Sequence, residues 1–279
     1  MFKAIWNSHL LPGPLTAASK SPCGAERLVV IGACLAALLM SAPVQAAPEE
    51  IQVYLDDLVG TGNFGMDVHN NYVISGSEVP DYPGGEAAEH LYRLTPEFYY
   101  GLSDTLELGL YTLTTRQPGR DPTFDGPKLR LKYIAPHDEK QGAFWGTNLE
   151  IGDTSLRVSP QPWGVEVKGI YGYRWSRWLF AVNTNLDWTS SRVFGGPASL
   201  DVDTKLAYET DAGYQLGFES YNELGELSHL GHLDQNSETL YAVMDTDLGK
   251  GMDLDLGLGR GLNAASDRWI LKFILGFHF

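Results

Sequence analysis

Hydrophobic and polar residues alternate along most of the chain beyond residue 62. In the stretch 252–258, one face reads Met, Leu, Leu, Leu and the other reads Asp, Asp, Gly. The stretch 128–133 alternates in the same way with basic residues on one face, and 178–188 places asparagine and aspartate opposite aromatic and aliphatic residues. A period of two with polar residues on one face only is typical of β-strands that separate an apolar from a polar medium.

This alternation, followed along the chain, predicts about twelve strands. Their expected ranges are 63–74, 89–100, 104–115, 126–135, 142–151, 163–174, 177–188, 201–209, 213–221, 237–246, 251–259 and 268–279. Most of them have the length that a tilted strand needs to cross the hydrocarbon layer of a bilayer. The alternation is weakest in 237–246, so the expected register is weakest there.

The expected connections alternate strictly between short and long. Turns are expected at 101–103, 136–141, 176, 210–212 and 249–250, and longer polar segments at 75–88, 116–125, 152–162, 189–200, 222–236 and 260–267. Outer-membrane barrels show this asymmetry, with short periplasmic turns and long outer loops. We therefore expect an all-β protein, a transmembrane antiparallel up-and-down β-barrel over residues 63–279, with both of its ends on the periplasmic side.

Tryptophan placement favours the same fold. The six tryptophans after residue 46 all lie at the ends of expected strands: Trp145, Trp163, Trp175, Trp178, Trp188 and Trp269. Membrane barrels place aromatic girdles there because the ring tolerates the headgroup region. The alternative is a soluble all-β fold, a sandwich or a lipocalin-like barrel, which would bury several of these rings in mid-strand.

The last expected strand carries an unbroken apolar face that ends in an aromatic residue. This face comprises Trp269, Leu271, Phe273, Leu275, Phe277 and Phe279. It resembles the C-terminal signal of outer-membrane proteins, which their assembly machinery recognises. The residues expected to form this signal are Lys272, Phe273, Phe277 and Phe279. The usual glycine two residues after the polar position is replaced here by Ile274.

Residues 1–46 have the layout of a secretory signal peptide. Lys20 and Arg27 precede the apolar run 28–42, and the segment ends in a small residue, Ala46. Cleavage is expected after Ala46, and a lipoprotein-type cleavage at Cys34 is the alternative. Residues 47–62 would then be a periplasmic extension, a plug that enters the lumen, or an edge segment of the sheet.

The charge of the chain narrows the range of partners. The net charge is −15, and loss of residues 1–46, which carry two net positive charges, takes it to −17. An acidic balance of this size argues against a nucleic-acid partner. Cys23 and Cys34 both lie in the removable segment, so no disulfide is expected in the mature chain. Helical membrane spans are excluded there because no window reaches roughly 18 consecutive apolar residues.

Many charged residues fall on the expected inner faces, with basic and acidic ones close to balance. The lumen-lining candidates are Lys128, Arg130, Lys132, Asp253, Asp255, Asp201, Asp203 and Glu107. Barrels of about eight strands fill with side chains and those of 16–18 leave a channel, so twelve strands are intermediate. Two hypotheses follow, a narrow charge-lined pore and a salt-bridged core without a pore. If the aspartates of 253–255 lie across from the basic ladder 128–132, the lumen carries a transverse field.

No catalytic residue, metal site or cofactor is predicted. The motifs G-x-S-x-G and H-E-x-x-H and a phosphate-binding glycine loop do not occur after residue 46. Ser228 and His229 come nearest to the pair that an outer-membrane phospholipase or protease needs, but adjacent loop residues are expected to point in different directions. His229, His232 and Asp234 have the spacing H-x-x-H-x-D, yet a polar loop gives these side chains no fixed geometry.

One hairpin resembles a known family. The stretch Leu94–Tyr111 contains the turn Tyr100-Gly101-Leu102-Ser103-Asp104 followed by Leu106-Glu107-Leu108-Gly109, and a strand rich in lysine, leucine and tyrosine follows at Lys128–Tyr133. These features are similar to a family of outer-membrane barrels named for a phenol meta-cleavage degradation pathway. The resemblance implies transport of small molecules, aromatic compounds among them, without catalytic residues.

The sequence therefore predicts a channel or transporter for a small solute in a Gram-negative outer membrane, reached by Sec-type export. Its expected partners are outer-membrane lipid, periplasmic chaperones, the barrel-assembly machinery and an unidentified small solute. The alternatives are a non-conducting structural or surface-interaction barrel and an outer-membrane enzyme of the phospholipase or protease type.

Overall fold

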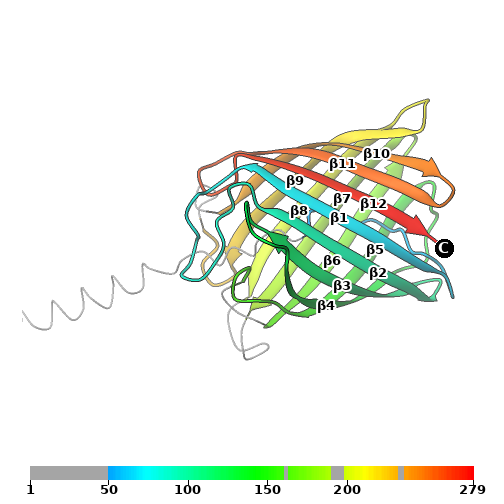
Figure 1. Cartoon of the computed structure of the whole chain (residues 1–279). Helices are drawn as coiled ribbons and strands as arrows, with labels where there is room; N and C mark the ends of the chain where they lie inside the picture. Colours follow the sequence, from blue (N-terminus) through cyan, green and yellow to red (C-terminus); the bar gives the residue numbers. More distant parts are fainter. Residues whose placement is uncertain (1–49, 160–162, 190–197, 232–235) are drawn as a thin grey trace, which may run out of the picture. The chain divides into compact units, whose positions relative to one another are not determined.

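The computed structural model describes residues 50–159, 163–189, 198–231 and 236–279, which belong to one compact unit. They form a closed antiparallel barrel in which each strand pairs with its neighbours in sequence and β12 pairs with β1 (Figure 1). The strands are β1 (Phe64–Ser75), β2 (Tyr92–Ser103), β3 (Leu106–Arg116), β4 (Thr123–Ile134), β5 (Gly142–Asp153), β6 (Trp163–Trp175), β7 (Trp178–Thr189), β8 (Ser199–Glu209), β9 (Tyr214–Glu226), β10 (Glu238–Gly249), β11 (Met252–Gly261) and β12 (Trp269–His278). The predicted twelve-stranded all-β barrel is confirmed. Within the described ranges, no helix is long and apolar enough to cross a membrane.

Successive side chains alternate between the lumen and the outer surface, as the pleat requires. In β5, Phe144 and Asn148 are buried inside, whereas Trp145 and Leu149 are exposed outside. The exposed set consists largely of leucine and aromatic residues. An apolar outer face of this extent is stable in contact with lipid chains.

The weakly alternating strand owes its pattern to an apolar inner face. In β10, Tyr241 and Val243 point inward and are buried, while Leu240 faces outward and is exposed. Both faces are therefore partly apolar, and the period of two is hard to see in the sequence.

The short and long connections separate to opposite ends of the barrel (Figure 1). The short ones, 104–105, 135–141, 176–177, 210–213 and 250–251, lie at the end where β12 finishes, called here the short-turn end. The other end is called the long-loop end. Two of the tight turns place a non-glycine residue in the left-handed region, Ser176 (φ 54°) and Lys250 (φ 59°). Two-residue hairpin turns need this conformation because only it matches the twist of the flanking strands.

Tryptophans mark both ends of the barrel. Trp145, Trp175 and Trp178 lie on strands near the short-turn end, and the other three lie near the long-loop end. Trp175 and Trp178 stack across the β6–β7 turn with ring centroids 6.3 Å apart. The two belts bracket the apolar outer face, as in barrels that cross a bilayer.

Residues 50–62, called here the inner segment, do not join the sheet. Ile51, Val53 and Tyr54 are each 2–3 % exposed, and the buried strand residues that pack with them lie on inward faces of the barrel. The segment therefore runs inside the barrel before it turns into β1 at the short-turn end (Figure 1).

Candidate functional site: the lumen and its inner segment

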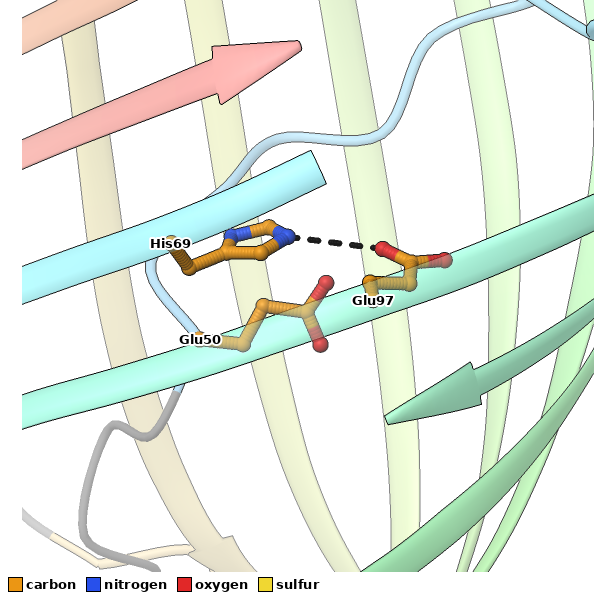
Figure 2. A group of neighbouring side chains, drawn as sticks. All are labelled: Glu50, His69 and Glu97. Carbon is orange, nitrogen blue, oxygen red and sulfur yellow. Dashed lines mark hydrogen bonds and ion pairs between the residues drawn. The ribbon is translucent and has the colours of Figure 1, made fainter. Parts of the chain in front are cut away.

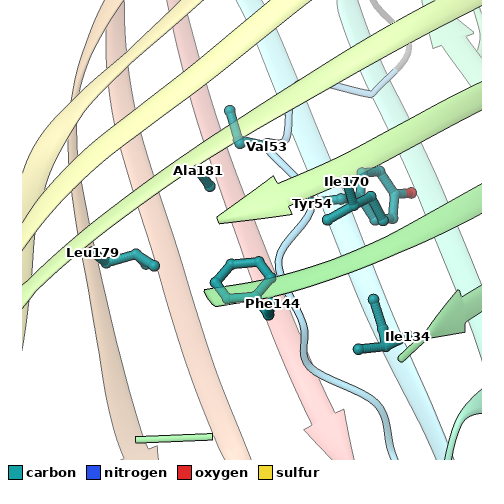
Figure 3. Close-up of a cluster of buried hydrophobic side chains, with 7 residues drawn as sticks. All are labelled: Val53, Tyr54, Ile134, Phe144, Ile170, Leu179 and Ala181. Atoms are coloured by element: carbon teal, nitrogen blue, oxygen red, sulfur yellow. The ribbon is translucent and has the colours of Figure 1, made fainter. Parts of the chain in front are cut away.

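An apolar contact holds the middle of the inner segment against one side of the lumen. Val53 and Tyr54 pack against a cluster drawn in Figure 3, which is made up of Ile134, Phe144, Ile170, Leu179 and Ala181. A second cluster around Ile51 consists of Tyr241, Val243 and Ile270. Full burial of one such side chain stabilises by about 1.5–3 kcal/mol. These residues occupy inward positions where a water-filled pore would be polar.

Asn183 on β7 binds the backbone of the inner segment. The N–H of Tyr54 donates to Oδ1 of Asn183 at 2.6 Å, and Nδ2 of Asn183 donates to the carbonyl oxygen of Tyr54 at 3.0 Å. The Asn183 side chain is fully buried. Because a buried backbone group must find a partner, this amide takes the place of a neighbouring strand.

The ring of Tyr54 lies among cations. The Nζ atoms of Lys168 and Lys132 are 4.4 Å and 5.2 Å from the ring centroid, and the Arg130 guanidinium carbon is at 5.5 Å. The Tyr54 hydroxyl is 2.5 Å from that of Tyr111 and also contacts Glu50. Cation–π attraction thus holds the face of the Tyr54 ring, and hydrogen bonds hold its hydroxyl group.

Charged residues hold the rest of the inner segment. Asp56 forms an ion pair with Arg174 and accepts from His137 Nε2 at 2.6 Å. Lys132 Nζ donates to the carbonyl oxygen of Asp57 at 2.8 Å, and the N–H of Val59 donates to Glu107 at 2.9 Å. The segment is therefore bound along its length.

The inner segment leaves the lumen against the β2–β3 hairpin. The N–H of Gly62 donates to the carbonyl oxygen of Gly101 at 2.8 Å. The N–H of Gly101 donates to the carbonyl oxygen of Asn63 at 3.1 Å. A Cβ atom on Gly101 would overlap the backbone of Gly60. Gly101 belongs to the turn motif that carries the family resemblance, so the motif has a structural role here.

The predicted lumen residues do face inward, and most have local partners. Arg130 pairs with Glu97 at 2.7 Å and Glu107 at 2.5 Å. Lys128 lies 3.9 Å from Glu150, and Lys132 lies 3.4 Å from Asp57. The basic ladder is therefore neutralised on its own side of the lumen.

The four aspartates predicted to line the lumen differ in their surroundings. Asp253 pairs with His278 at 2.6 Å, and Asp255 lies 3.2 Å from Lys272. Asp201 and Asp203 line a cavity toward the long-loop end. The local ion pairs weaken any electric field across the lumen. The transverse field and the lining of a pore by these residues stay predictions.

The residues predicted to form the assembly signal divide between the two faces of β12. Lys272 is fully buried in the lumen, where its Nζ lies 2.5 Å from Glu219 and 3.2 Å from the Ile51 carbonyl oxygen. Phe273 and Phe277 occupy alternate positions on the opposite face. Phe279 stacks on Phe64 with centroids 5.9 Å apart. Recognition by the assembly machinery stays a prediction.

One group of side chains could hold a metal ion. Figure 2 shows Glu50, His69 and Glu97, whose ligand atoms lie within 4.8 Å of one another. His69 Nε2 is 3.4 Å from a Glu97 oxygen, and Arg130 already pairs with Glu97. A cation there would compete with the guanidinium, so the cluster fits a hydrogen-bonded link between the inner segment and the strands β1 and β2 better than a metal centre.

The residues considered for catalysis lie in the loop after β9. Ser228 Oγ and His229 Nδ1 are 3.1 Å apart, so these neighbours face each other, contrary to the sequence-based expectation. Both side chains are exposed. His232 and Asp234, considered with His229 for metal binding, lie outside the described residues.

The inner segment separates two cavities of the lumen. The one toward the long-loop end, called here the upper cavity, has a volume of about 180 Å³. The one toward the short-turn end, called here the lower cavity, has a volume of about 400 Å³. Gln52 contributes to the wall of both. A solute that crossed the barrel would therefore have to pass the inner segment.

A wider cavity of about 1060 Å³ opens among the loops of the long-loop end. Arg93, Arg157 and Tyr82 are among its lining residues. Burial raises the pKa of the Tyr82 hydroxyl to about 12, and burial also raises the pKa of the Asp267 carboxyl in the β11–β12 loop. This cavity leads toward the upper cavity, since Asp267 borders both.

Solved structures with a similar architecture include an outer-membrane channel and two porins. The COG4313 outer membrane channel from Pseudomonas putida F1 matches with a TM-score of 0.59 and 15% identity, over 82% of this chain and 100% of that one. The fold is that of an outer-membrane β-barrel. The KdgM porin (TM-score 0.54, 7% identity, 77% and 99% covered) and the NanC porin (0.51, 11%, 77% and 98%) also match. At these identities the likeness concerns the fold alone. No family model and no curated protein gives a significant match.

Proposed function

We propose that the protein is an outer-membrane channel for a small solute and that its conducting path runs through the lumen past the inner segment. The observation that carries the proposal is the closed barrel whose lumen holds two cavities, one on each side of the inner segment, with Gln52 in the wall of both. The three solved structures named above share this fold at TM-scores above 0.5 and are described as a channel and two porins, which supports the proposal. The short-turn end would face the periplasm.

The size of the path limits the solute. Cavities of about 180 and 400 Å³ accommodate a small molecule rather than a polymer segment or a folded domain. The resemblance of the hairpin around Gly101 to the phenol meta-cleavage family extends the proposal to aromatic compounds. Tyr221 lines the upper cavity and Tyr54 lines the lower one, so aromatic side chains border the path on both sides of the inner segment.

The specific alternative is a non-conducting barrel, because the inner segment is bound by apolar, hydrogen-bonded and ionic contacts at once. Conductance of the refolded full chain in planar lipid bilayers separates the two functions. We expect small, discrete current steps for the wild type and larger ones when Tyr54 is replaced by alanine. If neither the wild type nor the Tyr54→Ala variant conducted, although a heat-modifiable gel shift showed that both barrels were folded, only the structural function would remain.

A further inference from the structure

Four carboxylates form an arc on the wall of the upper cavity. Glu166 lies directly opposite Asp187 in the β6–β7 ladder, and Asp201 lies directly opposite Glu223 in the β8–β9 ladder. All four line the cavity. We call them the acidic arc. Like charges in directly opposed cross-strand positions repel each other, so the wall is arranged unfavourably unless something positive faces it.

The basic residues of the same cavity do not balance this charge. Eight acidic residues and two lysines are among the described residues that line it. Lys168 Nζ lies 3.1 Å from Glu166 and 4.4 Å from the Tyr54 ring, and Lys128 Nζ lies 3.9 Å from Glu150. No ion pair with a basic residue joins Asp187, Asp201 or Glu223 among the described contacts. The lower cavity differs, because there Lys205, Lys272 and His278 pair with its aspartates.

A buried amide adds a second, independent observation. Asn185 is 5 % exposed, and its Nδ2 donates to Asp203 at 2.8 Å. The Asn185 side chain lines the upper cavity, and its Oδ1 is buried with no hydrogen-bond partner among the described residues. Buried acceptors without a donor are costly and call for a ligand that brings N–H or O–H groups.

The spacing of these oxygens selects the kind of cation. Among the described residues, the one group of three metal-ligating side chains with atoms within 4.8 Å of one another is Glu50, His69 and Glu97, and the arc is not part of it. A bare divalent ion needs several oxygens at about 2.0–2.6 Å. A dispersed set of acceptors fits an extended cation with several N–H donors.

We propose that the upper cavity is a binding site for small organic cations that carry ammonium or guanidinium groups, held by the acidic arc and by Oδ1 of Asn185. The inference deepens the proposed channel function by naming its solute class. The carboxylates supply charge attraction, and the Asn185 oxygen and Asp187 accept hydrogen bonds from the cation. Anions of the same size are excluded by the same charges.

Binding is testable without a membrane. Equilibrium dialysis of the refolded full chain in detergent against labelled putrescine and arginine, with succinate as the anion of matched length, measures affinity directly. We expect saturable binding of both cations at one site and none of succinate. Equal binding of succinate, or complete displacement of putrescine by Mg²⁺ at matched ionic strength, would overturn the proposal.

Variants locate the site. The double variant Asp187→Asn/Asp201→Asn should weaken putrescine binding by about 10- to 100-fold, the effect of losing charged hydrogen bonds. The double variant Asp138→Asn/Glu139→Gln makes the same change of charge in the exposed β4–β5 turn and should leave the affinity unchanged. Equal affinities for the two double variants would refute the site. Thermal unfolding without ligand is measured for both double variants, so that loss of binding by a folded protein is told apart from misfolding.

Bilayer recordings separate this inference from the function on which it rests. Putrescine binding without any conductance would leave the cation site in place and refute the channel. Conductance without putrescine binding would support the channel and refute the cation site.

Discussion

At the scale of single residues, the buried amide of Asn183 does for the inner segment what a strand edge does elsewhere in the barrel. It gives one donor and one acceptor to the backbone of Tyr54, at 3.0 and 2.6 Å. An aspartate would keep the acceptor but lose the donor, and a leucine would lose both. The chemistry of this single position therefore decides whether the middle of the inner segment has hydrogen-bond partners.

Replacement of Asn183 by alanine should free the inner segment. Two buried backbone groups lose their partners, at about 1–3 kcal/mol each, so the mean single-channel conductance should rise. Asn148→Ala is the matched control, because Asn148 is equally buried but donates to Glu150 on its own strand. An unchanged conductance in Asn183→Ala, or an equal rise in the control, would contradict this role.

Two substitutions at Tyr54 separate the ring from the hydroxyl. Tyr54→Phe keeps the apolar and cation–π contacts and should cost about 1 kcal/mol in the free energy of unfolding. Tyr54→Ala also removes the ring and should cost about 3–5 kcal/mol. Urea titrations of the refolded protein in lipid vesicles, followed by tryptophan fluorescence, would measure both. Similar costs for the two variants would show that the hydroxyl, rather than the ring, anchors the segment.

At the scale of elements, the hairpin β2–β3 and the turn into β1 fit backbone to backbone. Gly101→Ala should push the turn at Gly60 away from the hairpin, because the new methyl group would overlap the Gly60 carbonyl. We expect faster chymotrypsin cleavage after Tyr54, Leu55 and Leu58, measured by mass spectrometry. Gly164→Ala is the control, since its Cβ would meet only the Trp188 carbonyl, at 4.0 Å. The same cleavage rate in both variants would show that the contact between Gly101 and Gly60 does not hold the inner segment in place.

The aromatic residue after β12 can be tested for its role in assembly. Phe279→Ala should lower the amount of protein that reaches the outer membrane in cells, while refolding in detergent should change little, because Phe279 is 73 % exposed. Phe124→Ala removes another exposed aromatic side chain, from β4, and serves as control. Membrane fractionation with immunoblotting measures both. A normal amount of the Phe279→Ala variant in the outer membrane would contradict the predicted role of Phe279 in the assembly signal.

The strands could be predicted from the sequence, whereas for the inner segment the sequence left three alternatives open: a periplasmic extension, a plug that enters the lumen, or an edge segment. The alternation of apolar and polar residues is a local property, so neighbours such as Leu254 and Asp255 indicate the outer and the inner face of their strand. The partners of Tyr54 come from Tyr111, Asn183 and other strands far away in the sequence, and nothing near residue 54 specifies them. A signal did exist, because Phe144 and Ile170 are apolar residues at inward positions of neighbouring strands. Such a patch inside a barrel indicates that something covers it.

At the scale of the whole molecule, buried ion pairs connect one strand to the next around part of the barrel. Glu219 on β9 lies 3.0 Å from Lys205 on β8 and 2.5 Å from Lys272 on β12. The two lysines in turn contact Asp245 on β10 and Asp255 on β11. Five consecutive strands, up to the one that closes the barrel against β1, thus share one network.

Glu219→Gln should weaken this side of the barrel. Removing one member of a buried ion pair costs about 3–5 kcal/mol, and the lower end applies because each lysine keeps a second carboxylate. The temperature of the heat-modifiable gel shift should fall, whereas the exposed Glu209→Gln should behave like the wild type. An unchanged temperature for Glu219→Gln would show that Asp245 and Asp255 suffice.

The covalent link between the inner segment and β1 limits how the barrel could open. A short tether keeps a released segment at an effective concentration on the order of millimolar near its docking surface. Rebinding is therefore an intramolecular event that no dilution of the protein can slow. Openings that depend on release of residues 50–59 should be brief and independent of protein concentration, and a free peptide of the same sequence would compete only at comparable millimolar levels.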